Sequence, residues 1–114
     1  MTARRIDLGR SGEERVARRY EAHGYVVLER NWRTRRGEVD LILGREGSIV
    51  FCEVKTRTST RFGTGAEAVG WRKQRRLRQL GAEYLATRGS FVPEVRFDVA
   101  WVSPTGVRVF EAAF

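Results

Sequence analysis

The spacing of hydrophobic and polar positions along the chain predicts two amphipathic helices. Over residues 11–23 apolar side chains return every three or four positions, and the same repeat runs from about Ala68 to Thr87. Ser11 and Gly12 are expected to cap the first helix and Gly24 to end it, because small polar residues favour N-caps and glycine favours the left-handed conformation past a helix end. Each helix therefore has one apolar stripe with which to cover a sheet.

Runs rich in β-branched residues, bounded by turn-forming residues, predict the strands of the protein. These strands cover Tyr25–Arg33, Glu38–Leu43, Ser48–Arg57, Glu94–Val102 and Val107–Phe110. Residues 44–47 and 103–106 have the composition of hairpin turns, and the polar residues 59–65 are expected to form a loop. The order α-β-β-β-α-β-β, with no repeat or linker, predicts a single domain over residues 1–114 with a mixed α/β layer structure and one central sheet.

Three charged residues interrupt these apolar strands: Asp40, Glu53 and Lys55. A charge buried in a strand costs stability unless it is paired or binds a metal. Side chains alternate along a strand, so Glu53 and Lys55 share one face. A hairpin that closes symmetrically around residues 44–47 would set Asp40 opposite Phe51. Asp40 and Glu53 would then be diagonal neighbours at roughly 7–8 Å, a spacing at which two carboxylates can share one ion.

Glu13 is a fourth candidate, because it lies on the inward-facing stripe of the first helix with Tyr20. Carboxylates with a lysine beside them suit a Mg²⁺ or Mn²⁺ site that hydrolyses phosphodiester bonds. In such a site Lys55 would position the attacking water or neutralise a phosphate oxygen. From spacing alone, a structural ion pair of Lys55 with Glu53 or Asp40 stays an alternative.

The charge of the chain indicates a polyanionic partner. Among 114 residues, 22 are basic and 14 acidic, for a net charge of +8, and 20 of the basic residues are Arg. An excess of this size favours nucleic acid over an anionic membrane surface. We expect no membrane binding, because neither helix pattern has the strong division into basic and apolar faces that such surfaces require.

The remaining composition excludes several classes of protein. A single Cys and a single His exclude a disulfide framework and a metal centre rich in either residue. No apolar run approaches the roughly 20 residues that cross a bilayer. The basic N-terminal residues lack the apolar stretch of a secretory signal, so we expect a cytoplasmic protein.

Two basic stretches, Arg30–Arg36 and Arg72–Arg78, are candidate phosphate contacts. A solvated helix face is the alternative for the second stretch, but no acidic residue within it balances its charge. The residues expected to contact nucleic acid are Arg33, Arg35, Arg36, Arg57, Arg72, Lys73, Arg75 and Arg76.

Four further residues have mainly structural interpretations. Trp32 is expected to pack in the core, with base stacking as the alternative. Glu38 is expected to solvate the end of its strand, with support of a metal as the alternative. Asp98 is expected to pair with an arginine such as Arg96, and Cys52 to be a small core residue.

The chain resembles the PD-(D/E)XK nuclease superfamily in the order of its charged residues, and more closely the YraN-like family of bacterial proteins, relatives of archaeal Holliday-junction resolvases. A helix with Glu13, a strand with Asp40 and a strand with Glu53-Val54-Lys55 match the superfamily core. The closer resemblance rests on an ordered set of motifs: Leu8-Gly9-Arg10-x-Gly12-Glu13, Gly24-Tyr25, Asn31-Trp32-Arg33, Gly37-Glu38-Val39-Asp40-Leu41-Ile42, Phe51-x-Glu53-Val54-Lys55-x-Arg57, Lys73-Gln74-x-x-Leu77 and Arg96-Phe97-Asp98-Val99.

This resemblance implies a restriction-endonuclease-like sheet flanked by helices and a Mg²⁺- or Mn²⁺-dependent endonuclease acting on DNA, with branched and single-stranded forms as candidates. It makes Asp40, Glu53 and the Val54 carbonyl metal ligands. It places Lys55 at the attacking water, while Glu13 completes or orients the site. The proline that names the superfamily motif is absent, since Glu38-Val39 precedes Asp40. A nucleic-acid-binding protein without catalysis is the alternative, and a homodimer is left open.

Overall fold

The computed structural model describes residues 3–58 and 69–114, with side chains described from Ser11 onward. Two helices and five strands follow in the predicted order α-β-β-β-α-β-β, which confirms the fold class. The predicted loop over residues 59–65 lies outside the described residues. The elements are α1 (Ala3–Ala22), β1 (Val26–Thr34), β2 (Gly37–Arg45), β3 (Ser48–Thr56), α2 (Trp71–Arg88), β4 (Glu94–Ser103) and β5 (Gly106–Phe110).

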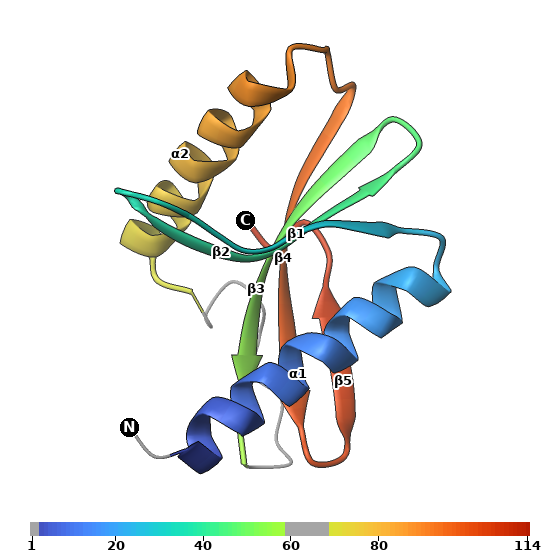
Figure 1. Cartoon of the computed structure of the whole chain (residues 1–114), viewed down its shortest axis with the longest axis vertical. Helices are drawn as coiled ribbons and strands as arrows, with labels where there is room; N and C mark the ends of the chain where they lie inside the picture. Colours follow the sequence, from blue (N-terminus) through green and yellow to red (C-terminus); the bar gives the residue numbers. More distant parts are fainter. Residues whose placement is uncertain (1–2, 59–68) are drawn as a thin grey trace.

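The strands form one mixed sheet in the order β1-β2-β3-β4-β5, with β3 and β4 parallel and all other pairs antiparallel. The two helices cover opposite faces of this sheet (Figure 1). On the α1 face, Val16, Ala17 and Tyr20 pack with Leu41 and Cys52. The burial of Cys52 confirms its predicted place in the core.

Aromatic side chains dominate the core on the α2 face. Phe51 and Phe97 stack at 5.2 Å between ring centroids, and Tyr84 of α2 meets Phe51 edge-on at 5.9 Å. Trp32 also packs against Tyr84, with 5.3 Å between ring centroids, which confirms that it packs in the core. The sheet is therefore buried on both sides, as expected for a strand–helix–strand unit with parallel strands.

The structure corrects two details of the sequence prediction. The first helix begins at Ala3 and not at Ser11, so Ser11 and Gly12 lie inside the helix and do not cap it. The hairpin between β2 and β3 closes with a two-residue turn, because Arg45 already pairs with Ser48 and Gly47 takes the positive φ of 74° that the turn needs. The register is consequently two residues away from the predicted one.

In the observed register Phe51 pairs with Ile42 and not with Asp40. A shift by two residues keeps every side chain on its face, because side chains alternate with a period of two. The predicted faces of Glu53 and Lys55 therefore hold, although the predicted partner of Asp40 was wrong.

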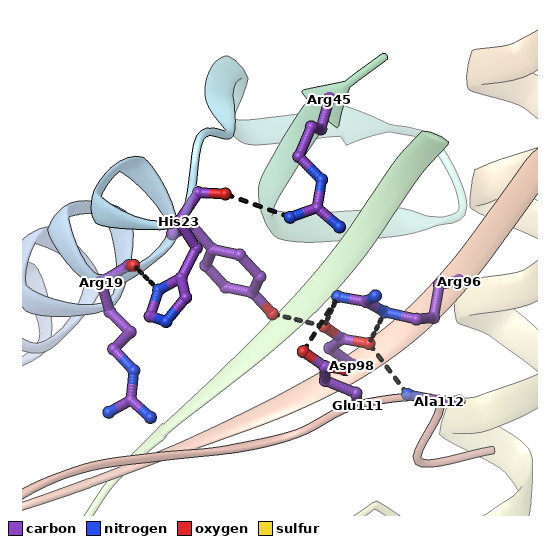
Figure 2. Close-up of polar contacts among 8 residues, drawn as sticks. Arg19, His23, Arg45, Arg96, Asp98, Glu111 and Ala112 are labelled. Carbon is purple, nitrogen blue, oxygen red and sulfur yellow. Dashed lines mark hydrogen bonds and ion pairs between the residues drawn. The ribbon is translucent and has the colours of Figure 1, made fainter. Parts of the chain in front are cut away.

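A buried polar network fastens α1 to the sheet and to the C-terminal residues. Asp98 of β4 is fully buried and accepts hydrogen bonds from Tyr20 Oη at 2.6 Å, from the Ala112 N–H at 3.0 Å and from the Arg96 guanidinium at 2.8 and 2.9 Å. Figure 2 shows the Arg96 guanidinium reaching both Asp98 and Glu111. The predicted pairing of Asp98 with Arg96 is confirmed. Within the described residues no helix has the length and apolar character needed to cross a membrane.

Candidate active site

The regular geometry of β2 breaks at Asp40. Leu41 belongs to the core on the α1 face, whereas Val39 belongs to the core on the α2 face. In an uninterrupted strand residues two apart share a face, so the chain turns between these residues. Figure 1 shows the first half of β2 leaving β3 and running toward α2. The sheet therefore opens between β2 and β3 at this point.

The Asp40 carboxylate lies in this opening. The ladder between β2 and β3 extends from Arg45–Ser48 to Leu41–Cys52. One residue further on, Asp40 Oδ2 accepts the N–H of Val54 at 2.7 Å. The Asp40 side chain thus accepts the backbone N–H that β2 leaves unpaired at the opening. This hydrogen bond holds it against β3 at Val54, the residue between Glu53 and Lys55.

Glu53 lies beside Asp40 with its side chain only 7% exposed. Its Oε2 is 2.7 Å from the Lys73 ammonium in the first turn of α2. This contact does not have the geometry of a hydrogen bond, and Oε2 has no hydrogen-bonding partner among the described residues. The interaction is therefore an ion pair across the gap between sheet and helix.

Asp40 and Glu53 are close enough to share a proton. Burial, followed by the hydrogen bond and the charge of Glu53, raises the pKa of Asp40. Burial alone would also raise the pKa of Glu53, but the hydrogen bond from Asp40 and the contact with Lys73 lower it. The favoured state at neutral pH thus has a protonated Asp40 and a charged Glu53, because two adjacent buried carboxylates cannot both ionise cheaply.

Lys55 follows Glu53 on the same face of β3 and is half-buried. Burial lowers the pKa of Lys55, and the positive charge of the neighbouring Lys73 lowers it further. Burial also opposes the charge of Lys73, but its contact with Glu53 outweighs this and raises the pKa of Lys73. Two adjacent lysines in different electrostatic states therefore border the carboxylate pair.

Glu13 of α1 approaches the same region from the other helix. It is half-buried, and its side chain is hydrogen-bonded to Asn31 of β1. Burial raises the pKa of Glu13, and the charges of Glu38 and Glu53 raise it further. The structure thus brings Glu13, Asp40, Glu53 and Lys55 into one electrostatic environment.

The residues predicted to contact nucleic acid separate into several groups. Arg33 pairs with Glu38, and Arg36 pairs with Glu83 of α2 at 2.8 Å. The pairing of Glu38 favours its predicted role at the strand surface. Arg57 lies over the Trp101 ring at 5.2 Å.

The exposed members of this set stand on α2 and at the turn between β1 and β2. Arg72 lies over the ring of Trp71, which is 66% exposed. The side chains of Arg35, Arg75 and Arg76 are exposed and take part in no ion pair with another described residue.

The two basic stretches lie side by side. A Cβ atom placed on Gly37, at the turn after Arg36, would be 3.2 Å from Cδ of Arg76. Thr34 and Arg36 both donate to Glu83 of α2, at 3.1 and 2.8 Å. Figure 1 shows the turn between β1 and β2 beside α2. The fold therefore joins stretches about 40 residues apart into one basic surface next to the opening of the sheet.

The arrangement fits a hard divalent cation with a small protein ligand set. Among the described residues no three Asp, Glu, His or Cys side chains form a complete metal-binding group. Mg²⁺ needs only one or two carboxylates, because it keeps several waters. Asp40 and Glu53 provide two oxygen donors, and the Lys73 ammonium already supplies a cation at Glu53.

Lys73 makes a contact that the sequence analysis did not predict. Its predicted contact with nucleic acid stays a prediction, and the structure adds an ion pair between its ammonium and Glu53. A signal existed in the composition, because only two of 22 basic residues are Lys. Lys and Arg are not interchangeable where a compact charge must approach one carboxylate oxygen.

The fold and this region define a class: an α/β protein whose mixed sheet carries acidic residues and lysines where two strands part. The chain belongs to the uncharacterised protein family UPF0102, whose family model matches residues 12–102. This is the YraN-like family that the sequence motifs indicate.

Similar proteins from several bacteria carry the same family name. A UPF0102 protein of Frankia alni is 53% identical over 105 residues, which cover 90% of this chain and 88% of the relative. A UPF0102 protein of Symbiobacterium thermophilum is 50% identical over 97 residues, covering 85% and 82% of the two chains. A third, from Syntrophomonas wolfei, is 48% identical over 93 residues, covering 82% and 81%. None of these names states an activity.

Proposed function

We propose that this protein is a Mg²⁺- or Mn²⁺-dependent nuclease that hydrolyses DNA phosphodiester bonds. The observation that carries the proposal is the meeting of Asp40, Glu53 and Lys55 at the opening between β2 and β3. The order of these residues along the chain matches the core of the PD-(D/E)XK nucleases. A structural ion pair explains one carboxylate and one lysine, but not a second, half-buried carboxylate beside them.

The carboxylates supply the reason for a metal. The raised pKa of Asp40 comes first from burial and then from the hydrogen bond and the charge of Glu53, so Asp40 favours its protonated form. A divalent cation between the two side chains would let both ionise, and we propose Asp40, Glu53 and the Val54 carbonyl as its protein ligands. When bound, the ion lowers the pKa of a coordinated water and offsets the charge that develops on the phosphate.

Lys55 and Glu13 have separate roles in this proposal. The lowered pKa of Lys55 suits an amine that orients the attacking water and exchanges a proton with it. Glu13, hydrogen-bonded to Asn31, lies at the edge of the carboxylate pair and would orient a water there. All of these side chains except Glu13 stand on two neighbouring strands, so a rigid sheet would hold the reacting groups in register.

The basic surface beside the opening is suited to hold the DNA backbone. Arg35, Arg75 and Arg76 are exposed. α2 has no side-chain cap and no acidic residue in its first turn. Its positive helix end and its arginines would together favour a phosphate close to Glu53 and Lys55.

A cleavage assay over several DNA forms tests the proposal. Single-stranded, duplex and four-way-junction DNA are incubated with the protein and Mn²⁺, with Mg²⁺ and with EDTA. We expect cleavage of at least one form that requires the metal. Asp40→Asn, Glu53→Gln and Lys55→Met should each reduce cleavage at least about 100-fold, while DNA binding in EDTA changes little.

The alternative is a nucleic-acid-binding protein without catalysis. Binding to all three DNA forms without cleavage in either metal would support it and would overturn the proposal. Cleavage that survives in Asp40→Asn and Glu53→Gln would also overturn the proposal, because it would arise from another site or a contaminating nuclease.

A further inference from the structure

Lys73 occupies an unusual place for a side chain of the basic helix. Its ammonium reaches back to Glu53 at 2.7 Å, although Lys73 is exposed like Arg72, Arg75 and Arg76. Glu53 is almost inaccessible to solvent, whereas the Lys73 side chain is 44% exposed. Only one partner of the ion pair is accessible to solvent. The lysine side chain can therefore turn toward water, while the carboxylate cannot.

The same ammonium is near the second lysine of the region. The positive charge of Lys73 lowers the pKa of Lys55, because the two side chains lie near each other. Two lysines so close together are stable only while an anion lies between or beside them. Glu53 supplies that anion in the protein on its own, and a phosphate group would supply a second one.

We infer that Lys73 is a positioning residue whose ammonium neutralises Glu53 in the protein on its own. It competes with the divalent metal for this carboxylate. When the metal binds, the ammonium moves to a phosphate of the DNA. This inference rests on the proposed function and adds to it. Both cations need the same carboxylate, so the ion pair of Lys73 must loosen before Glu53 can bind a metal. The flexible, half-exposed lysine stem makes this movement cheap.

A coupling between metal and DNA follows from this exchange. Without DNA, a metal displaces the Lys73 ammonium from Glu53 and leaves it beside Lys55 with no anion. With DNA, a phosphate receives the displaced ammonium. Metal and DNA should therefore strengthen each other's binding, and the coupling should be equal in both directions.

Calorimetric titration with Mn²⁺ tests the exchange without measuring cleavage. The proteins are wild type, Lys73→Met, Lys73→Arg and Arg108→Met, each titrated alone and with a short single-stranded oligonucleotide bearing non-hydrolysable linkages. Lys73→Met keeps the length of the side chain and removes its charge. Arg108→Met removes one charge from β5, where the Arg108 guanidinium lies over the Phe110 ring, and so is the control for the loss of a charge elsewhere. Circular dichroism checks that each variant is folded.

We expect Lys73→Met to bind Mn²⁺ about tenfold more tightly than wild type in the absence of DNA, which corresponds to about 1.4 kcal/mol. Lys73→Arg keeps a positive charge near Glu53 and should bind Mn²⁺ more weakly than Lys73→Met does, and Arg108→Met should bind Mn²⁺ as wild type does. Addition of the oligonucleotide should tighten Mn²⁺ binding to wild type more than to Lys73→Met, because only wild type has an ammonium that a phosphate can receive.

Two results would overturn the inference, and they are distinguishable. Equal or weaker Mn²⁺ binding by Lys73→Met, with wild type still binding the metal, would mean that Lys73 does not compete for Glu53, and the proposed nuclease function would be untouched. Mn²⁺ binding by neither protein would overturn the proposed metal centre and the inference with it.

Discussion

Asp40 and Glu53 place two acidic side chains in a buried space that accommodates one negative charge far more easily than two. Lys73 compensates the charge of Glu53, and a proton on Asp40 removes the second. Such a pair costs stability in the isolated protein, and it is the kind of arrangement that functional sites retain. The cost itself is measurable.

Substitution of Asp40 by Asn should flatten the dependence of stability on pH. The folded-state pKa of Asp40 lies above its ordinary value of 3.8. Its stabilising contribution is therefore complete below that pH and is lost as the pH rises toward the raised pKa. The amide imitates the protonated acid and cannot ionise, so we expect Asp40→Asn to exceed wild type in free energy of unfolding by about 1 kcal/mol or more at about pH 8.

Urea unfolding in EDTA, at about pH 5 and about pH 8, measures this difference. Glu46→Gln, in the exposed turn between β2 and β3, is the control and should keep the wild-type slope. A wild-type slope in Asp40→Asn would contradict the raised pKa of Asp40.

Sequence analysis identified Asp40, Glu53 and Lys55 because a charged residue in an apolar strand is a local signal. It could not place Lys73, because the contact with Glu53 depends on how the first turn of α2 docks against the sheet. That docking is set by Leu77 and Leu80 of α2, which pack on the aromatic core and are distant in sequence from Glu53. Local pattern shows which residues need an explanation, and tertiary packing decides which partners they meet.

At the scale of elements, the hairpin of β2 and β3 shows both what periodicity predicts and where it stops. The faces of Glu53 and Lys55 followed from alternation alone. The register did not, because the glycines at both 44 and 47 permitted a four-residue and a two-residue turn. The irregularity at Asp40 was not predictable either, since it depends on β2 leaving β3 to meet α2.

The contact of α2 with the sheet depends on Gly81. A Cβ atom at this position would lie 2.9 Å from Cζ of Phe97 and 3.3 Å from Cε2 of Phe51. In an open helix, Gly→Ala stabilises by about 1 kcal/mol. Here the stacked rings cannot give way freely, so we expect Gly81→Ala to destabilise by about 1–3 kcal/mol.

Thermal or urea unfolding of Gly81→Ala gives the sign of this effect directly. An increase in stability would mean that the rings of Phe51 and Phe97 move apart without cost, and that α2 is loosely packed. The Lys73–Glu53 contact would then be less well fixed than the structure indicates.

The contact of α1 with the sheet depends on the hydrogen bond from Tyr20 to Asp98. Burial raises the pKa of Tyr20, as do the charges beside it, so the phenol stays protonated and donates at 2.6 Å. Hydrogen bonds to charged groups stabilise more than neutral ones, and we expect Tyr20→Phe to cost about 2 kcal/mol.

Tyr84→Phe is the matched control for this prediction. Tyr84 is also buried, but the hydrogen bond that its hydroxyl receives from Arg88, among the described residues, is long at 3.4 Å. We expect it to cost well under about 1 kcal/mol. Equal losses in the two variants, measured by urea unfolding, would show that Asp98 does not depend on Tyr20 and is satisfied by Arg96 and the Ala112 N–H.

At the scale of the whole molecule, the net charge of +8 is unevenly arranged. Several arginines of the β1–β2 hairpin and of α2 pair with acidic residues or lie over aromatic rings. The exposed remainder gathers along α2 and at the β1–β2 turn, beside the opening that holds Asp40 and Glu53. The net charge predicts a polyanionic partner. The fold gathers the exposed arginines on the surface where such a partner would lie next to Asp40 and Glu53.

This arrangement predicts that removing two arginines beside the opening weakens DNA binding more than removing two arginines elsewhere on the surface. In the double variant Arg75→Gln/Arg76→Gln, the exposed first half of α2 loses two charges. In Arg88→Gln/Arg108→Gln, the same number is lost at the last turn of α2 and on β5. Fluorescence anisotropy in EDTA, at several salt concentrations, compares their affinities for a labelled oligonucleotide.

We expect the first variant to lower the slope of log affinity against log salt by about 1.5–2, because two phosphate contacts and their released counterions are lost. Its affinity should fall about tenfold at moderate salt, while the second variant should keep the wild-type slope. An equal change in both would mean that the total charge, and not the surface beside the carboxylates, attracts the DNA. In that case phosphate would not be guided to Glu53 and Lys55, and the link between the basic surface and the proposed chemistry would fail.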